Sequence, residues 1–371
     1  METTAELPWD LIVQILRRLP VKDLLRYMCV SKSWCSLING LDFINLHLKH
    51  IPESPSQLGF VSGDDNNLCW TASNDLDSFV RLTCPIDLGT GVSVLGSCNG
   101  LLAIMNPDSD MAIWNPFIRR YITLPISDHF HSIPEHEIHV FLTGFGHDPV
   151  TDDYKLMILI DPHERLTDTI HGEVKIYSVN GKSWKKIDDF PKHFDYHSFN
   201  GVLCGNALHW LVNSRRDNSY LILAFDLVTE TAREIQLPLK HCPCLQLVNL
   251  EGSLCAVIYN VRFSYFEVWE MKEYGIKESW AMLSPLPTPP LLEFPFFKNG
   301  DHVLFHNCET LFLYDIKTKV SNKREVAGSD FPRICHARVW VCVKSLVGLH
   351  FSESTSNGKE HAATHRDDFL S

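Results

Sequence analysis

The N-terminal organisation of this chain is decided by the stretch LPWDLIVQILRRLPVKDLLRYMCVSKSWCSLI, which covers residues 7–38. The apolar residues of its first half recur at the spacing of one helical stripe and are Leu11, Ile12, Ile15, Leu16 and Leu19. Pro8 suits the first turn of a helix, where a missing N–H costs nothing, and Pro20 cannot continue one. The stretch therefore predicts a first helix between these two prolines.

Three further short helices are expected after Pro20. The second covers residues 21–28, the third begins after Ser31 as its N-cap, and the fourth is capped by Asp42 and runs to His50. A unit of about 45 residues is too small to bury so much apolar surface without a partner. A small helical cap on a larger domain is the plainer alternative.

The order and spacing of these residues closely resemble an F-box as found in plant proteins. The pattern is Leu7-Pro8-x-Asp10-Leu11-x3-Ile15-Leu16-x-Arg18-Leu19-Pro20-Val21-Lys22-x-Leu24-Leu25-Arg26-x3-Val30-Ser31-Lys32-x-Trp34-x2-Leu37-Ile38. The resemblance implies that residues 5–50 form a helical F-box module. It further implies that this module docks on a Skp-type adaptor, which hangs from the cullin of a ubiquitin ligase. The residues that it marks as adaptor contacts or near-interface core are Leu7, Pro8, Ile12, Ile15, Leu16, Leu19, Pro20, Val30 and Trp34.

Composition limits the remaining possibilities. The chain has 371 residues, 45% hydrophobic and 21% charged, with a formal net charge of -12, which allows two globular domains. Without a Lys/Arg cluster on a recognisable motif, nucleic acid and membrane surfaces are not expected partners. The N-terminus has no signal-peptide pattern, no apolar run is long enough to cross a membrane, and most of the 12 cysteines have apolar neighbours, as reduced thiols do. A cytoplasmic or nuclear location is expected.

Short β-rich segments dominate after residue 90, and an aromatic residue followed by a polar turn recurs among them. These aromatic residues are Trp114, Tyr177, Phe225, Trp269 and Tyr314, separated by 63, 48, 44 and 45 residues. The later period is typical of one four-stranded propeller blade, which predicts about six blades. Residues 338–343 are expected to complete a blade begun around residues 79–82, and Trp210 to pack between blades. A β-sandwich or barrel with hairpins of similar length is the alternative.

The body also resembles the F-box-associated, kelch-like domain of plant F-box proteins. The motifs that carry this resemblance are Ser97-Cys98-Asn99-Gly100-Leu101-Leu102, Trp114-Asn115-Pro116, Gly144-Phe145-Gly146-x-Asp148-x3-Asp152-Asp153-Tyr154-Lys155, Gly205-x-Ala207-Leu208-His209-Trp210 and Ser345-Leu346-Val347. The paired glycines of true kelch repeats are mostly absent. The expected chain is an α+β multidomain protein: an F-box over 5–50, a linker and first strands over 51–90, a mostly-β domain over 91–350, and a disordered tail over 351–371.

No catalytic, cofactor or metal site is expected. The segment His241-Cys242-Pro243-Cys244 lacks a second ligand pair, and Gly144-Phe145-Gly146 lacks the third glycine of a dinucleotide loop. The two resemblances together imply a non-catalytic receptor that holds a protein substrate for ubiquitination and degradation. Two alternatives stay open: a propeller enzyme or glycan- or small-ligand-binding domain with a helical appendage, and an F-box protein that acts without a ligase.

Overall fold

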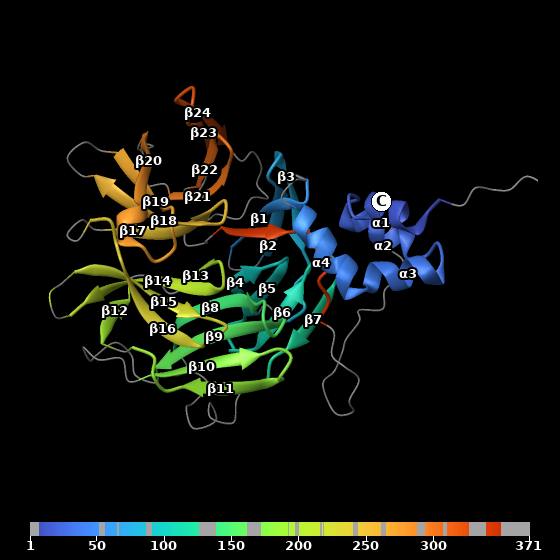
Figure 1. Ribbon diagram of the computed structural model, residues 1–371, viewed down its shortest axis with the longest axis horizontal. Helices are drawn as coiled ribbons and strands as arrows, with labels where there is room; N and C mark the ends of the chain where they lie inside the picture. Colours follow the sequence, from blue (N-terminus) through green and yellow to red (C-terminus); the bar gives the residue numbers. More distant parts are fainter. Residues whose placement is uncertain are drawn as a thin grey trace, which may run out of the picture.

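The fold is taken from a computed structural model of the chain. It describes residues 7–51, 56–64, 67–86, 91–125, 139–161, 172–191, 193–196, 200–215, 217, 219–239, 244–260, 265–287, 294–306, 310–325 and 339–349. The expected disordered tail and residues 241–243 of the cysteine-containing segment lie outside these ranges. Within them, a small helical module stands beside a ring of β-sheets (Figure 1).

Four helices form the N-terminal module: α1 (Trp9–Leu16), α2 (Val21–Tyr27), α3 (Lys32–Asn39) and α4 (Leu41–His50). The Ser31 hydroxyl accepts a hydrogen bond from the Trp34 N–H at 3.1 Å, as expected for the N-cap of α3. The expected cap of α4 is wrong, because the helix begins after the extended Gly40 and Asp42 lies in its first turn. The expected extent of the first helix is also wrong, because α1 ends before Leu19, whose place ahead of Pro20 disfavours helical backbone.

Six antiparallel sheets make up the rest of the described chain. The first three are β25 (Trp340–Val343) with β1 (Leu58–Asp64), β2 (Asn67–Ala72) and β3 (Asp75–Leu82); β4 (Ser93–Cys98), β5 (Leu101–Met105), β6 (Met111–Asn115) and β7 (Arg120–Thr123); and β8 (His139–Asp148), β9 (Asp153–Asp161), β10 (Glu173–Ser178) and β11 (Ser183–Ile187). These sheets are blades 1, 2 and 3 of a propeller.

Blades 4, 5 and 6 follow in chain order. They are β12 (Phe194–Tyr196), β13 (Val202–Cys204), β14 (Ala207–Ser214), β15 (Tyr220–Asp226) and β16 (Thr231–Gln236); β17 (Cys244–Leu250), β18 (Ser253–Asn260), β19 (Tyr265–Met271) and β20 (Trp280–Pro287); and β21 (Phe294–Asn299), β22 (His302–His306), β23 (Thr310–Asp315) and β24 (Val320–Glu325). A short 3-10 helix, η3 (Lys277–Ser279), precedes β20. The expected six-bladed propeller is thus confirmed.

The ring is closed by strands from the two ends of the chain. β25 pairs antiparallel with β1, and Leu58 lies opposite Val343. Blade 1 therefore takes its innermost strand from the C-terminal part of the chain, as the sequence led us to expect. The innermost strands contact one another around the ring in the order β25, β4, β8, β13, β17, β21 and back to β25.

The apolar core is divided among the interfaces between neighbouring blades. Trp210, fully buried, packs between blades 3 and 4 with Met157 and Phe225, and its indole N–H donates to the Thr143 carbonyl at 3.1 Å. Separate clusters fill the interfaces of blades 4 and 5, 5 and 6, 6 and 1, and 1 and 2. The cluster between blades 2 and 3 also contains residues of the helical module, so helices and propeller share one core.

Five tight turns share one construction that explains the sequence repeat. In each turn a side-chain oxygen accepts a backbone N–H from two or three residues ahead. The residue four positions ahead of that side chain has a left-handed backbone, with a φ of 50° to 57°. The pairs are Asn115 and Arg119, Asp148 and Asp152, Ser178 and Lys182, Asp226 and Glu230, and Asp315 and Lys319. Each turn joins the first and second or the third and fourth strand of its blade, so all five lie on one side of the ring, the capped-turn face.

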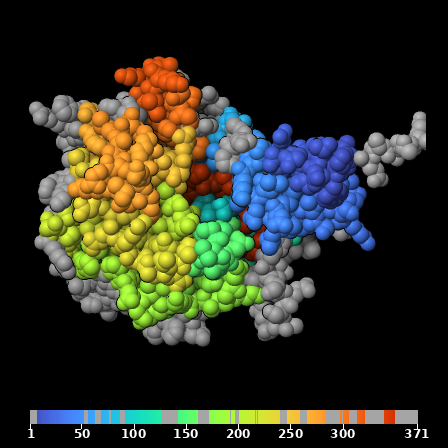
Figure 2. Space-filling view, in the orientation of Figure 1, coloured from blue at the N-terminus to red at the C-terminus, as the bar shows by residue number. Residues whose placement is uncertain are grey.

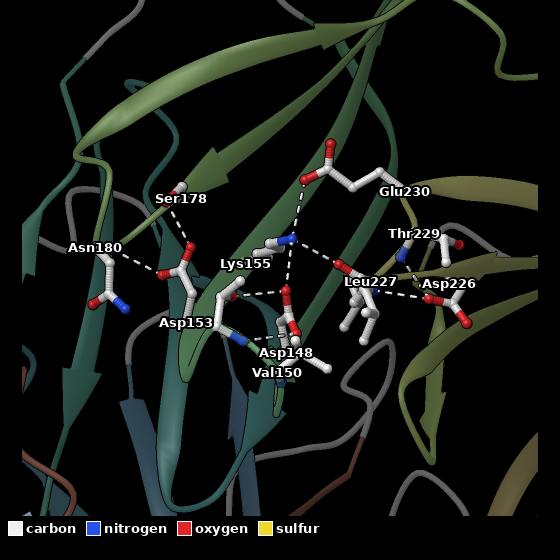
Figure 3. Close-up of polar contacts among 12 residues, drawn as sticks. Asp148, Val150, Asp153, Lys155, Ser178, Asn180, Asp226, Leu227, Thr229 and Glu230 are labelled. Atoms are coloured by element: carbon white, nitrogen blue, oxygen red, sulfur yellow. Dashed lines mark hydrogen bonds and ion pairs between the residues drawn. The ribbon is translucent and has the colours of Figure 1, made fainter.

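A buried ion pair joins two of these turns across blades 3 and 4 (Figure 3). The Lys155 ammonium lies 3.0 Å from Asp148, 3.0 Å from Glu230 and 2.7 Å from the Leu227 carbonyl oxygen. Although burial raises the pKa of Asp148, hydrogen bonds from the Thr151 hydroxyl, Lys155 and two backbone N–H groups outweigh it and lower the pKa to about 2. The carboxylate therefore contributes stability at neutral pH that is lost as the pH falls from the ordinary value of 3.8 toward 2.

Replacing Lys155 with methionine is expected to lower the free energy of unfolding by about 3 kcal/mol, because it leaves a buried carboxylate without its cation. Lys185 is exposed and pairs with the same Glu230, so Lys185→Met is the matched control, with an expected loss below about 1 kcal/mol. Urea unfolding of both variants measures the difference. Equal losses would contradict a special contribution of the buried pair.

Candidate docking face of the helical module

One side of α1 presents a row of apolar side chains to solvent. Leu11 and Ile15 are four residues apart and lie on one side of the helix, and Leu7 is exposed just before the helix begins at Trp9. Their exposed fractions are 54%, 51% and 53%, whereas the next residue, Leu16, is only 1% exposed. The helix is therefore apolar on its buried side and also on part of its exposed side.

The structure sorts the nine residues marked by the F-box resemblance into three groups. Leu7, Pro8, Ile15, Pro20 and Val30 are exposed; Ile12, Leu19 and Trp34 are half-buried; Leu16 is buried. Leu16 belongs to the core that includes Val21, Leu24 and Phe43. Leu16 packs on the buried side of α1 and is not available to a partner in the free chain.

The sequence did not mark four exposed apolar residues of the same module as adaptor contacts: Trp9, Leu11, Tyr27 and Leu41. Leu11 could have been found from its spacing of four residues to Ile15 on the same helix. The Tyr27 ring packs edge-on against Trp34, with the ring centroids 5.8 Å apart, and so links α2 to α3. This contact depends on how the two helices cross, which no local pattern in the sequence indicates.

The exposed apolar side chains are concentrated in this module. In the described part of the chain, 13 large apolar side chains are exposed, and seven of them lie between Leu7 and Leu41. The module projects from one side of the propeller, as the blue region of Figure 2 shows. Such a concentration on about 35 residues is typical of a protein-binding surface. We call Leu11 and Ile15, together with Leu7 just before the helix, the α1 face; Trp9, the first residue of α1, is exposed on another side of the helix.

Buried titratable groups in the propeller have structural partners. His209 is fully buried between the Val202 carbonyl oxygen, 3.0 Å from Nδ1, and the Tyr274 hydroxyl, 2.7 Å from Nε2; burial lowers its pKa to about 4. Burial raises the pKa of the Cys98 and Cys255 thiols to about 12, which keeps them protonated and poor nucleophiles. Among the residues that the structure describes, no three His, Cys, Asp or Glu side chains are grouped as metal ligands would be.

The helices themselves are short. None of those in the described ranges has the length and apolar composition needed to cross a membrane.

Two family models match this chain in the order of its two structural parts. Residues 5–46 match the F-box domain, and residues 73–333 match the F-box associated beta propeller domain. The chain belongs to the F-box proteins with an F-box-associated β-propeller.

Curated relatives agree with this family. F-box protein CPR1 of Arabidopsis thaliana is 32% identical over 309 residues, which cover 77% of this chain and 74% of the relative. An F-box/kelch-repeat protein of the same plant is 29% identical, covering 87% of this chain and 96% of the relative. Among solved structures, TolB from Acinetobacter baumannii aligns with 81% of this chain and 70% of its own at 11% identity and a TM-score of 0.47, too distant to transfer a function.

The neighbouring residues Ile15 and Leu16 test which side of α1 is exposed and which is buried. Leu16→Asp buries an unpaired charge and is expected to destabilise the helices by more than about 3 kcal/mol. Ile15→Asp, on the exposed side, is expected to change stability by less than about 0.5 kcal/mol. Hydrogen exchange of the amides in α1 to α4 measures both effects. Similar protection in the two variants would show that the inner and outer sides are assigned wrongly.

Proposed function

We propose that this F-box protein is the substrate-recognition subunit of a Skp–cullin–F-box ubiquitin ligase. The α1 face binds the Skp-type adaptor and through it the cullin, and the propeller binds a protein substrate for ubiquitination and degradation. The observation that carries the proposal is the row of exposed apolar side chains at Leu7, Leu11 and Ile15 on a module of the F-box family. The chain itself performs no chemistry and acts by raising the local concentration of the substrate.

The α1 face has enough apolar surface for stable docking. Burying one Leu or Ile side chain contributes roughly 1.5–3 kcal/mol before the costs of association. The half-exposed Trp9, on another side of α1, offers a further aromatic anchor of the kind that dominates interfaces. A few such anchors in a complementary groove give an affinity suited to a lasting complex.

The substrate is expected on the propeller face opposite to the capped-turn face. On the capped-turn face, turns of neighbouring blades are bonded to one another: Asn99 to Tyr154, Lys155 to Glu230, Asn249 to Leu203, and Lys298 to Glu251. Both chain ends also leave the ring on this side, where Leu58 lies opposite Val343. The opposite face carries the connections between blades, and binding residues are commonly found on such connections.

The proposed place of action is the cytoplasm or the nucleus. Cys98, Cys204, Cys255 and Cys342 are free thiols buried in the propeller. Thiols in this state are typical of compartments where glutathione and thioredoxin keep cysteines reduced.

Co-purification of the full chain with a plant Skp-type adaptor tests the docking proposal. The intact chain is expected to bring down adaptor and cullin, and Leu11→Asp/Ile15→Asp to lose at least about 100-fold in adaptor affinity, because two anchors become charges. Val80→Asp is the matched control, since Val80 is 55% exposed on the propeller strand β3. Failure of the intact chain to bind the adaptor refutes the proposal.

Charge changes on the two faces of the propeller test where the substrate binds. Asp108 and Asp189 are exposed on the opposite face, whereas Val150 is 74% exposed on the capped-turn face. We expect Asp108→Lys/Asp189→Lys, but not Val150→Lys, to reduce the ubiquitin-modified proteins recovered with the ligase. Quantitative mass spectrometry compares the three chains. A selective loss with Val150→Lys would place substrate binding on the capped-turn face instead.

A further inference from the structure

The chain that follows the ring-closing strand β25 runs between the helices and the propeller. We call residues 344–349 the strap. Its apolar side chains Leu346, Val347 and Leu349 are 7%, 6% and 7% exposed. They lie in the same core cluster as Leu16, Leu24 and Phe43 of the helices and Leu101, Ile113 and Tyr177 of blades 2 and 3. In Figure 2, red atoms of the C-terminal residues lie between the blue helices and the rest of the propeller.

Polar contacts fix the strap to blade 2. Asn115 is fully buried, and its side-chain amide nitrogen Nδ2 donates to the carbonyl oxygens of Ser345 at 3.1 Å and Val347 at 3.0 Å. The Ser345 hydroxyl donates to the Asn99 carbonyl oxygen at 2.6 Å. Next to it, Gly100 has a φ of +83°, and a Cβ there would lie 2.4 Å from Ser345 Oγ and 2.5 Å from the Val343 carbonyl oxygen. The hairpin turn at 99–100 therefore accommodates the strap only because residue 100 has no side chain.

Hydrogen bonds of the buried Gln57 link the strap to the helices. Gln57, 2% exposed, accepts the Lys344 N–H on its backbone oxygen at 2.7 Å. Its side-chain oxygen accepts the N–H of Val21, the first residue of α2, at 3.3 Å. The Lys344 ammonium lies 3.9 Å from the centroid of the Trp70 ring in blade 1. Burial, together with the charge of Lys22 in α2, lowers the pKa of Lys344. The first residue of the strap is thus in contact with blade 1 and within electrostatic range of α2.

We propose that the strap is a positioning element that holds the F-box helices and the propeller in one orientation. This inference rests on the proposed ligase function and deepens it, because a fixed orientation sets where a bound substrate stands relative to the adaptor and cullin. Gln57, Asn115 and Ser345 are its positioning residues, since they act through the strap and touch neither partner. Without the packed strap, the core shared by helices and propeller loses Leu346, Val347 and Leu349, so we expect the two parts to take up a range of orientations, which lowers the effective concentration of the substrate.

Pulsed electron paramagnetic resonance on the full chain tests the proposal without adaptor or substrate. Spin labels are placed through unnatural amino acids at two exposed positions, Gln14 on α1 and Asp188 after β11. The unaltered strap is expected to give one narrow distance distribution. Leu346→Ser/Val347→Ser/Leu349→Ser is expected to broaden it at least twofold, and the conservative control Leu346→Met/Val347→Ile/Leu349→Met to keep it narrow.

Three further measurements separate positioning from a loss of folding. Gln57→Leu removes only the side-chain link to α2 and is expected to broaden the distribution while leaving the propeller melting temperature unchanged. Adaptor affinity is expected to stay within twofold in every strap variant, because the α1 face is untouched. A narrow distribution in both the serine variant and Gln57→Leu, or a broad one in the unaltered chain, would overturn the proposal. Failure of the ligase proposal would show instead as absent adaptor binding alongside a narrow distribution.

Discussion

The pairing of β25 with β1 is the constraint on which the rest of the structure depends. A ring of blades has no free inner edge only if its last strand returns to its first sheet, and here the two strands lie opposite each other from Leu58 and Val343 onward. Closure brings residues more than 270 positions apart into contact, as in the hydrogen bond from the Trp70 indole to the Cys342 carbonyl oxygen. The six blades therefore depend on both ends of the chain at once.

Closure also places the N-terminal helices and the C-terminal strap together. Because β25 is the innermost strand of blade 1 and β1 its neighbour, the chain enters and leaves the ring at the same side. The helices before β1 and residues 344–349 after β25 must then share the space above blade 2, where Asn115 and Asn99 receive the strap. The ring topology thus makes the two faces of the propeller different, because the chain ends and the helices lie on the capped-turn face.

The parts of this fold that could be predicted from sequence are those with local causes. Ser31 caps α3 through a hydrogen bond three residues ahead, and the aromatic-then-polar repeat marks turns in which residues such as Asp226 and Asp315 accept neighbouring N–H groups. Helix ends were less predictable from the sequence. The N-cap of α4 is Gly40, which has extended backbone, and not the expected Asp42. The sides of α1 could not be separated because Ile15 and Leu16 are consecutive and equally apolar, and only the packing of the whole module buries one of them.

The packing of the strap between the helices and blade 2 could not be predicted from the sequence, because the residues in contact are far apart in the chain. Asn115 and Ser345 are 230 residues apart, and neither has a neighbour that signals the contact. Their hydrogen bonds matter more for specificity than for net stability: an apolar contact alone tolerates sliding, whereas a buried amide that loses its partners carries a penalty of about 1–3 kcal/mol. Leu346, Val347 and Leu349 provide the burial, and Asn115, Ser345 and Gln57 restrict it to one arrangement. Such a division of labour is what a scaffold needs when the direction of a bound protein, and not only its capture, decides the outcome.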